Sequence, residues 1–106
     1  MEGEGYLRLS LSYEKHVRSL PALERELKLL DGDAGVRLEG RYRGKKCFAF
    51  VTRFGKTYSA MVCSSVKRGN SQVPGRSLAW VEFASVSDVV TFLAALATPS
   101  VSAYVY

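Results

Sequence analysis

The sequence predicts an α+β fold, with an antiparallel sheet of four to five strands and two helices packed mainly on one face. Three segments with strand-like patterns follow one another between residues 36 and 65, separated by Gly44 and Gly55. An apolar stripe with helical spacing precedes them, and a capped apolar segment follows them. At 106 residues, 47% of them hydrophobic, the chain can bury one modest core, so we expect a single domain over residues 1–106.

The N-terminal third is expected to contribute one strand and one helix. Residues 7–11 alternate leucine with polar side chains, which is typical of a short strand. A helix is expected over residues 20–30, because Ser19 can cap its start and Pro21 suits its first turn. Its stripe consists of Leu20, Leu23, Leu27 and Leu30. We expect this stripe to pack on the sheet, although one so narrow also suits a seam between two protomers.

Three strands are expected in quick succession, at residues 36–43, 46–54 and 57–65. Two-residue turns at Gly44-Lys45 and Gly55-Lys56 would fix their register. That register pairs Arg41 with Phe48, Glu39 with Phe50, and Phe50 with Met61. We expect a slip of one residue in either turn to scramble the assignment of side chains to the two faces.

Alternation along these strands separates two faces of the sheet. One face is mostly small and aliphatic, as expected beneath helices: Val36, Leu38, Tyr42, Cys47, Ala49, Val51, Tyr58, Ala60 and Val62. The other mixes cations, hydroxyls and aromatics: Arg37, Glu39, Arg41, Phe48, Phe50, Thr52, Phe54, Thr57, Ser59, Met61 and Cys63. Three phenylalanines are unusual on a solvent face and two arginines are unusual on a buried one, so this mixture favours a ligand-binding surface.

The last third is expected to form a polar loop, a strand and a second helix. The loop covers residues 66–77 and the strand covers residues 78–84. Ser85 and Asp88 resemble a capping box at the start of a helix that runs to about residue 97, before Pro99. The alternating tail at 101–106 would add an edge strand that pairs with a second protomer, so we expect a homo-oligomer.

Positive charge is concentrated in one stretch of the chain. Between Arg37 and Arg76 there are ten Lys or Arg and one acid, Glu39, which gives a net charge of +9 (ten minus one). The rest of the chain has five basic and nine acidic residues, a net charge of −4. Aromatics are interleaved with the cations, a combination that suits a polyanion with stackable bases. The alternative is a solvated basic face over an aromatic core.

Other functional classes have little support in the sequence. His16 is the single histidine, and it lies beside two cations at the start of a helix. Cys47 and Cys63 have no metal-ligand spacing and fall on opposite faces of the predicted sheet, so we expect free thiols in a reducing cytoplasm. No apolar run is long enough to span a membrane, and no glycine-rich phosphate loop is present. We therefore expect a cytoplasmic protein that is not an enzyme and carries no cofactor or metal.

The segment at residues 46–53 matches five of the seven defined positions of the strand signature of RNA-recognition motifs. That fold requires a helix after this strand, whereas Gly55 here leads directly into another strand. We interpret the match as convergence on alternate aromatics that stack bases on an exposed sheet. The alternative is that Phe48 and Phe50 belong to the core.

The segment GRYRGKKCFAFVTRFGKTYSAMVCSS, between a leucine-striped helix and a capped helix, resembles the ThermoDBP-like single-stranded DNA-binding proteins of archaea and their shorter relatives. The likeness is one of arrangement and covers roughly residues 6–96. It implies an antiparallel α+β fold and sequence-tolerant binding of single strands in a groove of aromatic and basic residues.

We therefore predict a single-stranded DNA-binding protein. The predicted stacking residues are Phe48, Phe50, Phe54, Tyr58 and Trp80. The predicted phosphate-binding residues are Arg37, Arg41, Arg43, Lys45, Lys46, Arg53, Lys56, Lys67, Arg68 and Arg76. Two alternatives remain: an RNA-binding accessory protein, and a protein-interaction adaptor that uses the phenylalanine face and the leucine stripe.

Overall fold

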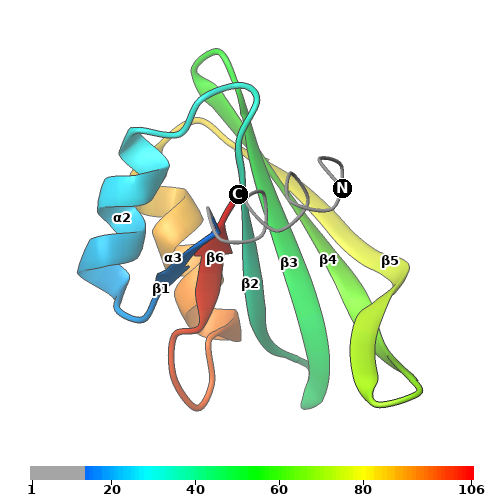
Figure 1. Ribbon diagram of the computed structural model, residues 1–106. Helices are drawn as coiled ribbons and strands as arrows, with labels where there is room; N and C mark the ends of the chain where they lie inside the picture. The colour runs from blue at the N-terminus through cyan, green and yellow to red at the C-terminus, as the bar shows by residue number, and fades with distance from the viewer. Residues whose placement is uncertain (1–13) are drawn as a thin grey trace, which may run out of the picture.

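The computed structural model describes residues 14–106, and the strand predicted at residues 7–11 lies outside this range. The described chain forms an antiparallel sheet with two helices on one face (Figure 1). Its elements are β1 (Lys15–Val17), α2 (Leu20–Lys28), β2 (Gly35–Tyr42), β3 (Lys45–Phe54), β4 (Thr57–Arg68), β5 (Ser71–Phe83), α3 (Val86–Leu96) and β6 (Ala103–Val105). The α+β class and the two helices are confirmed. The predicted strand count was too low, because six strands occur in the described residues, in the order β1-β6-β2-β3-β4-β5.

Both helices pack against the aliphatic face of the sheet. The Ser19 hydroxyl accepts the backbone N–H of Ala22 at 3.3 Å and caps α2 as predicted. Leu23 and Leu27 are completely buried against the sheet residues Val36, Leu38, Ala49, Val51, Ala60 and Val62. The leucine stripe is thus used within the chain, which contradicts its alternative role as a seam between protomers.

The C-terminal tail lies inside the sheet. Strand β6 pairs with β1 on one side and with β2 on the other, so both of its edges are occupied. Tyr106 and Gly35 exchange two backbone hydrogen bonds that extend this pairing. The prediction that the tail is an edge strand free to pair with a second protomer was therefore wrong. A three-residue strand carries no pattern that reveals its neighbours.

The β2–β3 turn differs from the prediction by one residue. It is formed by Arg43 and Gly44, with φ of 55° and 83°, so Tyr42 pairs with Lys45 and Arg41 pairs with Lys46. The register shifts by two residues, which preserves the assignment of side chains to the two faces. In the β3–β4 hairpin the predicted pairing of Phe50 with Met61 is confirmed.

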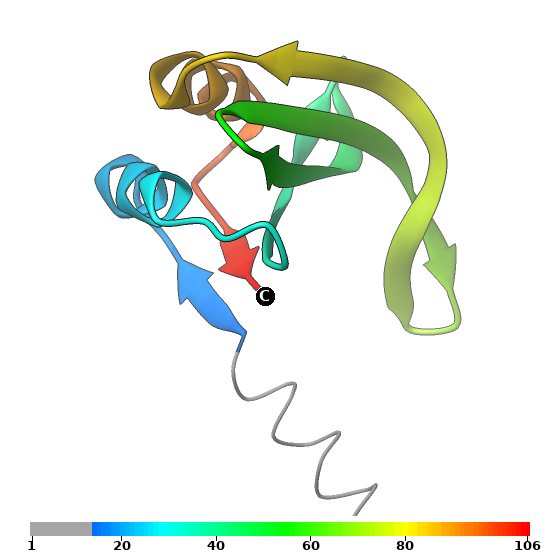
Figure 2. The same ribbon diagram turned by 90° about the horizontal axis from the view of Figure 1, so that it is seen from above.

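Residues 66–68 and 71–77 form strands where a polar loop was predicted. Strands β4 and β5 continue as a hairpin beyond Ser64, where the pairing of β3 with β4 ends, and turn at Gly69-Asn70. We call residues 65–77 the arm. Register irregularities between Val62 and Ser65 bend the arm away from the helices (Figure 2). Because the arm is exposed and polar, it lacks the apolar alternation by which strands are identified.

Candidate nucleic-acid interface

The sheet face opposite the helices, which we call the open face, carries one continuous row of side chains across all six strands. The pairing of neighbouring strands aligns its members in the order His16, Tyr104, Arg37, Phe50, Met61 and Trp80. Neighbouring strands are about 4.8 Å apart, so this cross-strand row is about 24 Å long. It presents aromatic rings, a guanidinium and a thioether, all of which form favourable contacts with flat π systems.

One half of the cross-strand row is held in place by its own contacts. The rings of His16 and Tyr104 stack at 4.4 Å with an angle of 5° between their planes. The guanidinium of Arg37 lies 4.5 Å from the centre of the Tyr104 ring and forms two hydrogen bonds with the Glu14 carboxylate, at 3.0 and 3.2 Å. In the other half Trp80 is 71% exposed and Met61 is 38% exposed. This half offers the free surface.

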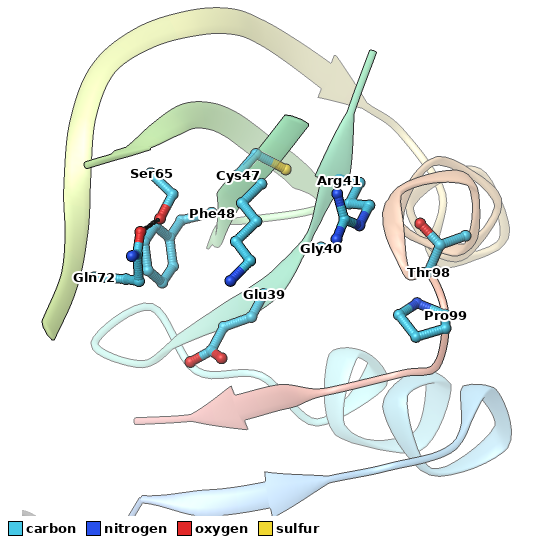
Figure 3. Close-up of a pocket in the computed structure, with 10 residues that line it drawn as sticks. Glu39, Gly40, Arg41, Cys47, Phe48, Ser65, Gln72, Thr98 and Pro99 are labelled. Carbon is cyan, nitrogen blue, oxygen red and sulfur yellow. Dashed lines mark hydrogen bonds between the residues drawn. The ribbon is translucent and has the colours of Figure 1, made fainter. Parts of the chain in front are cut away.

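A groove adjoins the row, between the β2–β3 hairpin and the arm. It consists of three adjoining pockets of about 560, 210 and 540 Å³. Figure 3 shows the central pocket, where Phe48 lies beside Gln72 of the arm while Glu39 and Arg41 project from β2. Gln72 lines all three pockets and accepts the Ser65 hydroxyl at 2.6 Å. The arm therefore forms one wall of a continuous channel.

The channel is strongly basic. Six cations and one carboxylate, Glu39, line it; the cations are Arg37, Arg41, Arg43, Lys45, Lys46 and Arg76. Within residues 14–106, only Arg37 among these cations has a carboxylate oxygen within 4.0 Å. Arg41 and Lys46 face each other directly across β2 and β3, an arrangement that costs stability through like-charge repulsion. A bound anion would relieve that repulsion.

Phe48 and Phe50 differ in their access to the open face. Both lie on it as predicted, with their ring centres 6.3 Å apart. Phe48 is only 7% exposed, because it is packed beneath the arm, whereas Phe50 is half-buried. The prediction of Phe48 as a stacking residue was therefore wrong, because no local pattern indicates that the polar segment folds over it.

The side chains of Tyr58 and Arg53 lie on the helix side of the sheet. Tyr58 is 3% exposed, and its hydroxyl donates to the carbonyl of Leu27 at 2.9 Å. Arg53 donates to the carbonyls of Lys28 and Leu30, at the C-terminal end of α2, and to that of Gly55. These contacts contradict the predicted roles in stacking and phosphate binding. Both residues alternate onto the helix face, where a helix end needs hydrogen-bond donors.

The remaining predicted residues lie outside the row and the channel. Phe54 is 90% exposed and Lys56 is exposed, both at the β3–β4 turn. Lys67 and Arg68 are exposed near the tip of the arm. Sequence reasoning missed His16 and Tyr104, because the pairing of β6 between β1 and β2 brings them into the row. The alternation of the tail was the only available signal.

His16 and Ser102 lie close together but do not form an activated nucleophile. His16 Nε2 is 3.2 Å from the Ser102 hydroxyl, and the Arg18 side chain donates to His16 Nδ1 at 3.0 Å. An arginine N–H only donates, so Nδ1 accepts and the neutral ring carries its proton on Nε2. That nitrogen therefore cannot remove the serine proton.

The two cysteines are free and buried. Burial raises the pKa of both thiols, which keeps them protonated and poorly reactive near neutral pH. No three His, Cys, Asp or Glu side chains gather into a possible metal site within residues 14–106.

Neither helix in the described part of the chain is long and apolar enough to cross a membrane. Comparisons of the chain with protein-family models, with curated proteins and with solved structures gave no match. The resemblance to the ThermoDBP-like proteins therefore stays a hypothesis.

Proposed function

We propose that this protein binds single-stranded nucleic acid without sequence preference and without catalysis, on the open face of its sheet. The observation that carries the proposal is the cross-strand row, which runs beside a channel of cations that have few acidic partners. Stacking and phosphate contacts together are the usual basis of sequence-tolerant binding of single strands. The resemblance to the ThermoDBP-like proteins favours DNA over RNA, and the free thiols favour the cytoplasm.

A single strand suits the row better than a duplex does. Bases in a duplex face each other and are closed to aromatic side chains, whereas the bases of a single strand expose their faces. At the 3.4 Å spacing of stacked bases, the cross-strand row corresponds to roughly seven nucleotides, and to fewer in an extended strand.

Fluorescence anisotropy with labelled oligo-dT, oligo-U and duplex DNA of equal length, at two salt concentrations, tests the proposal. We expect oligo-dT to bind more tightly than the duplex, with an affinity that falls steeply as salt rises, by about 0.7 logarithmic units per phosphate contact per decade of salt. The exposed cation Arg25, on α2, provides a matched control, and Arg25→Ala should leave the affinity unchanged. Equal or tighter binding of duplex DNA would reject the stacking surface.

A second candidate is a protein-interaction role, favoured by strand β5. This strand is an edge of the sheet, and its segment from Leu78 to Val81 exposes Leu78, Trp80 and Val81. Exposed apolar edges of this kind pair readily with other chains, including a second copy. Light scattering at low and high salt distinguishes this candidate, because an apolar interface persists at high salt while binding through phosphates weakens.

A further inference from the structure

One end of the channel is a pocket lined by cations. It has a volume of about 540 Å³ and lies between the β2–β3 turn and the arm. Four cations line it, namely Arg43, Lys45, Lys46 and Arg76, and its lining contains no acid. Tyr42 and Leu78 add apolar surface, and Ser64 and Ser65 add hydroxyls. The volume lies within the range of small-molecule sites and exceeds what a phosphate group alone occupies.

Arg43 occupies a backbone position that favours a different residue. It is the one described non-glycine residue with positive φ, at 55°, and Gly44 follows at 83°. Two consecutive positive φ values define a type I′ turn, for which Asn-Gly is the preferred sequence. The Arg43 guanidinium lies 5.2 Å above the centre of the Tyr42 ring. A strained position that keeps a cation beside the pocket points to a functional requirement for that cation.

Arg76 lines the same pocket at a point where the pairing of β4 with β5 is irregular. Its backbone N–H donates to the Ser64 hydroxyl at 3.1 Å, across the irregular part of the β4–β5 pairing. The preceding residue is Gly75, where a Cβ atom would lie 2.6 Å from the Val66 side chain and would also collide with the Ser64 hydroxyl. The close backbone approach at Gly75 therefore sets the position from which Arg76 lines the pocket. Bulges commonly redirect a side chain in this way.

We propose that this pocket binds a terminal nucleotide through its phosphomonoester, so that the protein prefers single strands with a phosphorylated end. The inference rests on the proposed function and deepens it. A phosphomonoester carries a charge of about −1.5 to −2 near neutral pH, against −1 for a phosphodiester inside a strand. Four cations without an acid favour the group with the higher charge, while Tyr42 and Leu78 contact the sugar and base of the end nucleotide.

The channel connects this pocket with the cross-strand row. The pocket proposed for the end nucleotide, which we call the terminal pocket, shares Lys46, Ser65 and Gln72 with the central pocket of the channel. The central pocket in turn shares Phe48 with the third pocket, which is lined by Phe50. A strand whose end nucleotide occupies the pocket thus passes Lys46 and Arg41 before its bases reach the row.

The test compares oligo-dT of one length in three forms, with a 5′-phosphate, with a 3′-phosphate and with hydroxyls at both ends, by anisotropy with the full chain. We expect one phosphorylated form to bind about tenfold more tightly, because a charged phosphate gains at least one charge-assisted hydrogen bond. This advantage should shrink as the pH falls below about 6, where the phosphomonoester becomes a monoanion. Thymidine monophosphate and inorganic phosphate, added as competitors, distinguish a strand end from a free nucleotide or phosphate.

Two substitutions locate the effect in the pocket. Arg43→Asn keeps the preferred turn chemistry and removes the cation, so the protein should fold while losing most of the tenfold preference. Arg76→Gln should act in the same direction. Arg25→Ala, which removes a cation from the helix side of the sheet, should retain the preference.

The outcomes separate this inference from the proposed function. Equal affinity for all three oligo-dT forms would reject the proposed binding of a terminal nucleotide in this pocket and leave single-strand binding intact. A preference that survives both Arg43→Asn and Arg76→Gln would also overturn it. Competition by thymidine monophosphate at concentrations equal to the oligonucleotide would reassign the pocket to free nucleotides. Failure of every oligo-dT form to bind would instead reject the proposed function.

Discussion

Arg53 and Lys46 lie on the same strand, β3, yet on opposite faces of the sheet. Arg53 donates three hydrogen bonds to backbone carbonyls and lies 5.3 Å from the centre of the Tyr58 ring. Lys46 lines the channel and faces Arg41. The same charge therefore stabilises the fold at one position and is available to a ligand at the other.

Substitution of these two cations should have opposite consequences. Arg53→Ala should lower the free energy of unfolding by about 0.5–1.5 kcal/mol, because carbonyls at the end of α2 lose their hydrogen-bond donor. Lys46→Ala should leave stability unchanged or slightly raised, since it removes a like-charge pair. In binding, Lys46→Ala should reduce the salt slope by roughly 0.7, and Arg53→Ala should not. Urea denaturation and salt titrations measure both effects, and a reduced salt slope for Arg53→Ala alone would reverse these assignments.

The two most exposed aromatic side chains of the open face, Trp80 and Phe54, allow binding at the row to be tested separately from binding elsewhere on that face. Trp80 belongs to the cross-strand row, whereas Phe54 lies four residues from Phe50 along β3, about 13 Å away. Trp80→Ala should weaken binding of oligo-dT by about 1–3 kcal/mol, the contribution of one stacked base. Phe54→Ala should have little effect. Anisotropy titrations check the pair, and the reverse result would place the strand near the β3–β4 turn.

At the scale of elements, the arm determines the shape of the site. Strand β4 has twelve residues and β5 has thirteen, so their hairpin extends past the end of β3 and folds over Phe48. The arm converts a flat sheet face into a channel with two walls. Its polar sequence hides this role, because the arm contributes to the site through backbone shape and hydrogen bonds more than through apolar burial.

Phe48 should be essential to the packing beneath the arm. Phe48→Ala should lower the free energy of unfolding by about 3–5 kcal/mol, because it leaves a cavity under Ser65 and Gln72. Leu29, which is 77% exposed on the helix side, provides the control, and Leu29→Ala should change stability by less than about 0.5 kcal/mol. Chemical denaturation monitored by circular dichroism measures both. A cost near zero at Phe48 would mean that the arm does not pack on the sheet.

At the scale of the molecule, the two ends of the described chain meet in the sheet. Strand β6 joins β1 to β2, and this arrangement completes the row by placing Tyr104 between His16 and Arg37. Ala103 is completely buried in the core, which ties the tail to the helix side as well. The first half of the row therefore exists only when the tail is in place.

Truncation after Pro99 should destabilise the domain. It removes β6 from between two partners and leaves the edge of β2 unpaired, so we expect a clear loss of thermal stability and of oligo-dT binding. Thermal denaturation followed by circular dichroism tests this expectation. A truncated chain that unfolds at the same temperature as the full chain would contradict the position of β6.

Features that depend on local patterns follow from the sequence alone. Alternation at residues 36–65 determined the two faces, and the spacing of Leu23 and Leu27, with Ser19 as the cap, determined α2 and its buried side. The faces were predicted correctly even though the turn is at Arg43-Gly44, because that difference shifts the register by an even number of residues. The concentration of charge between Arg37 and Arg76 also follows directly from the sequence.

Which of those residues share a site depends on long-range contacts. Long-range pairing places β6 beside β2, and the curvature of the arm buries Phe48 while it brings Arg76 to Arg43. Such contacts join residues far apart in the chain, and no local period encodes them. The tertiary structure likewise assigns Tyr58 and Arg53 to the end of α2, where their side chains donate to carbonyls that lack a partner within the helix.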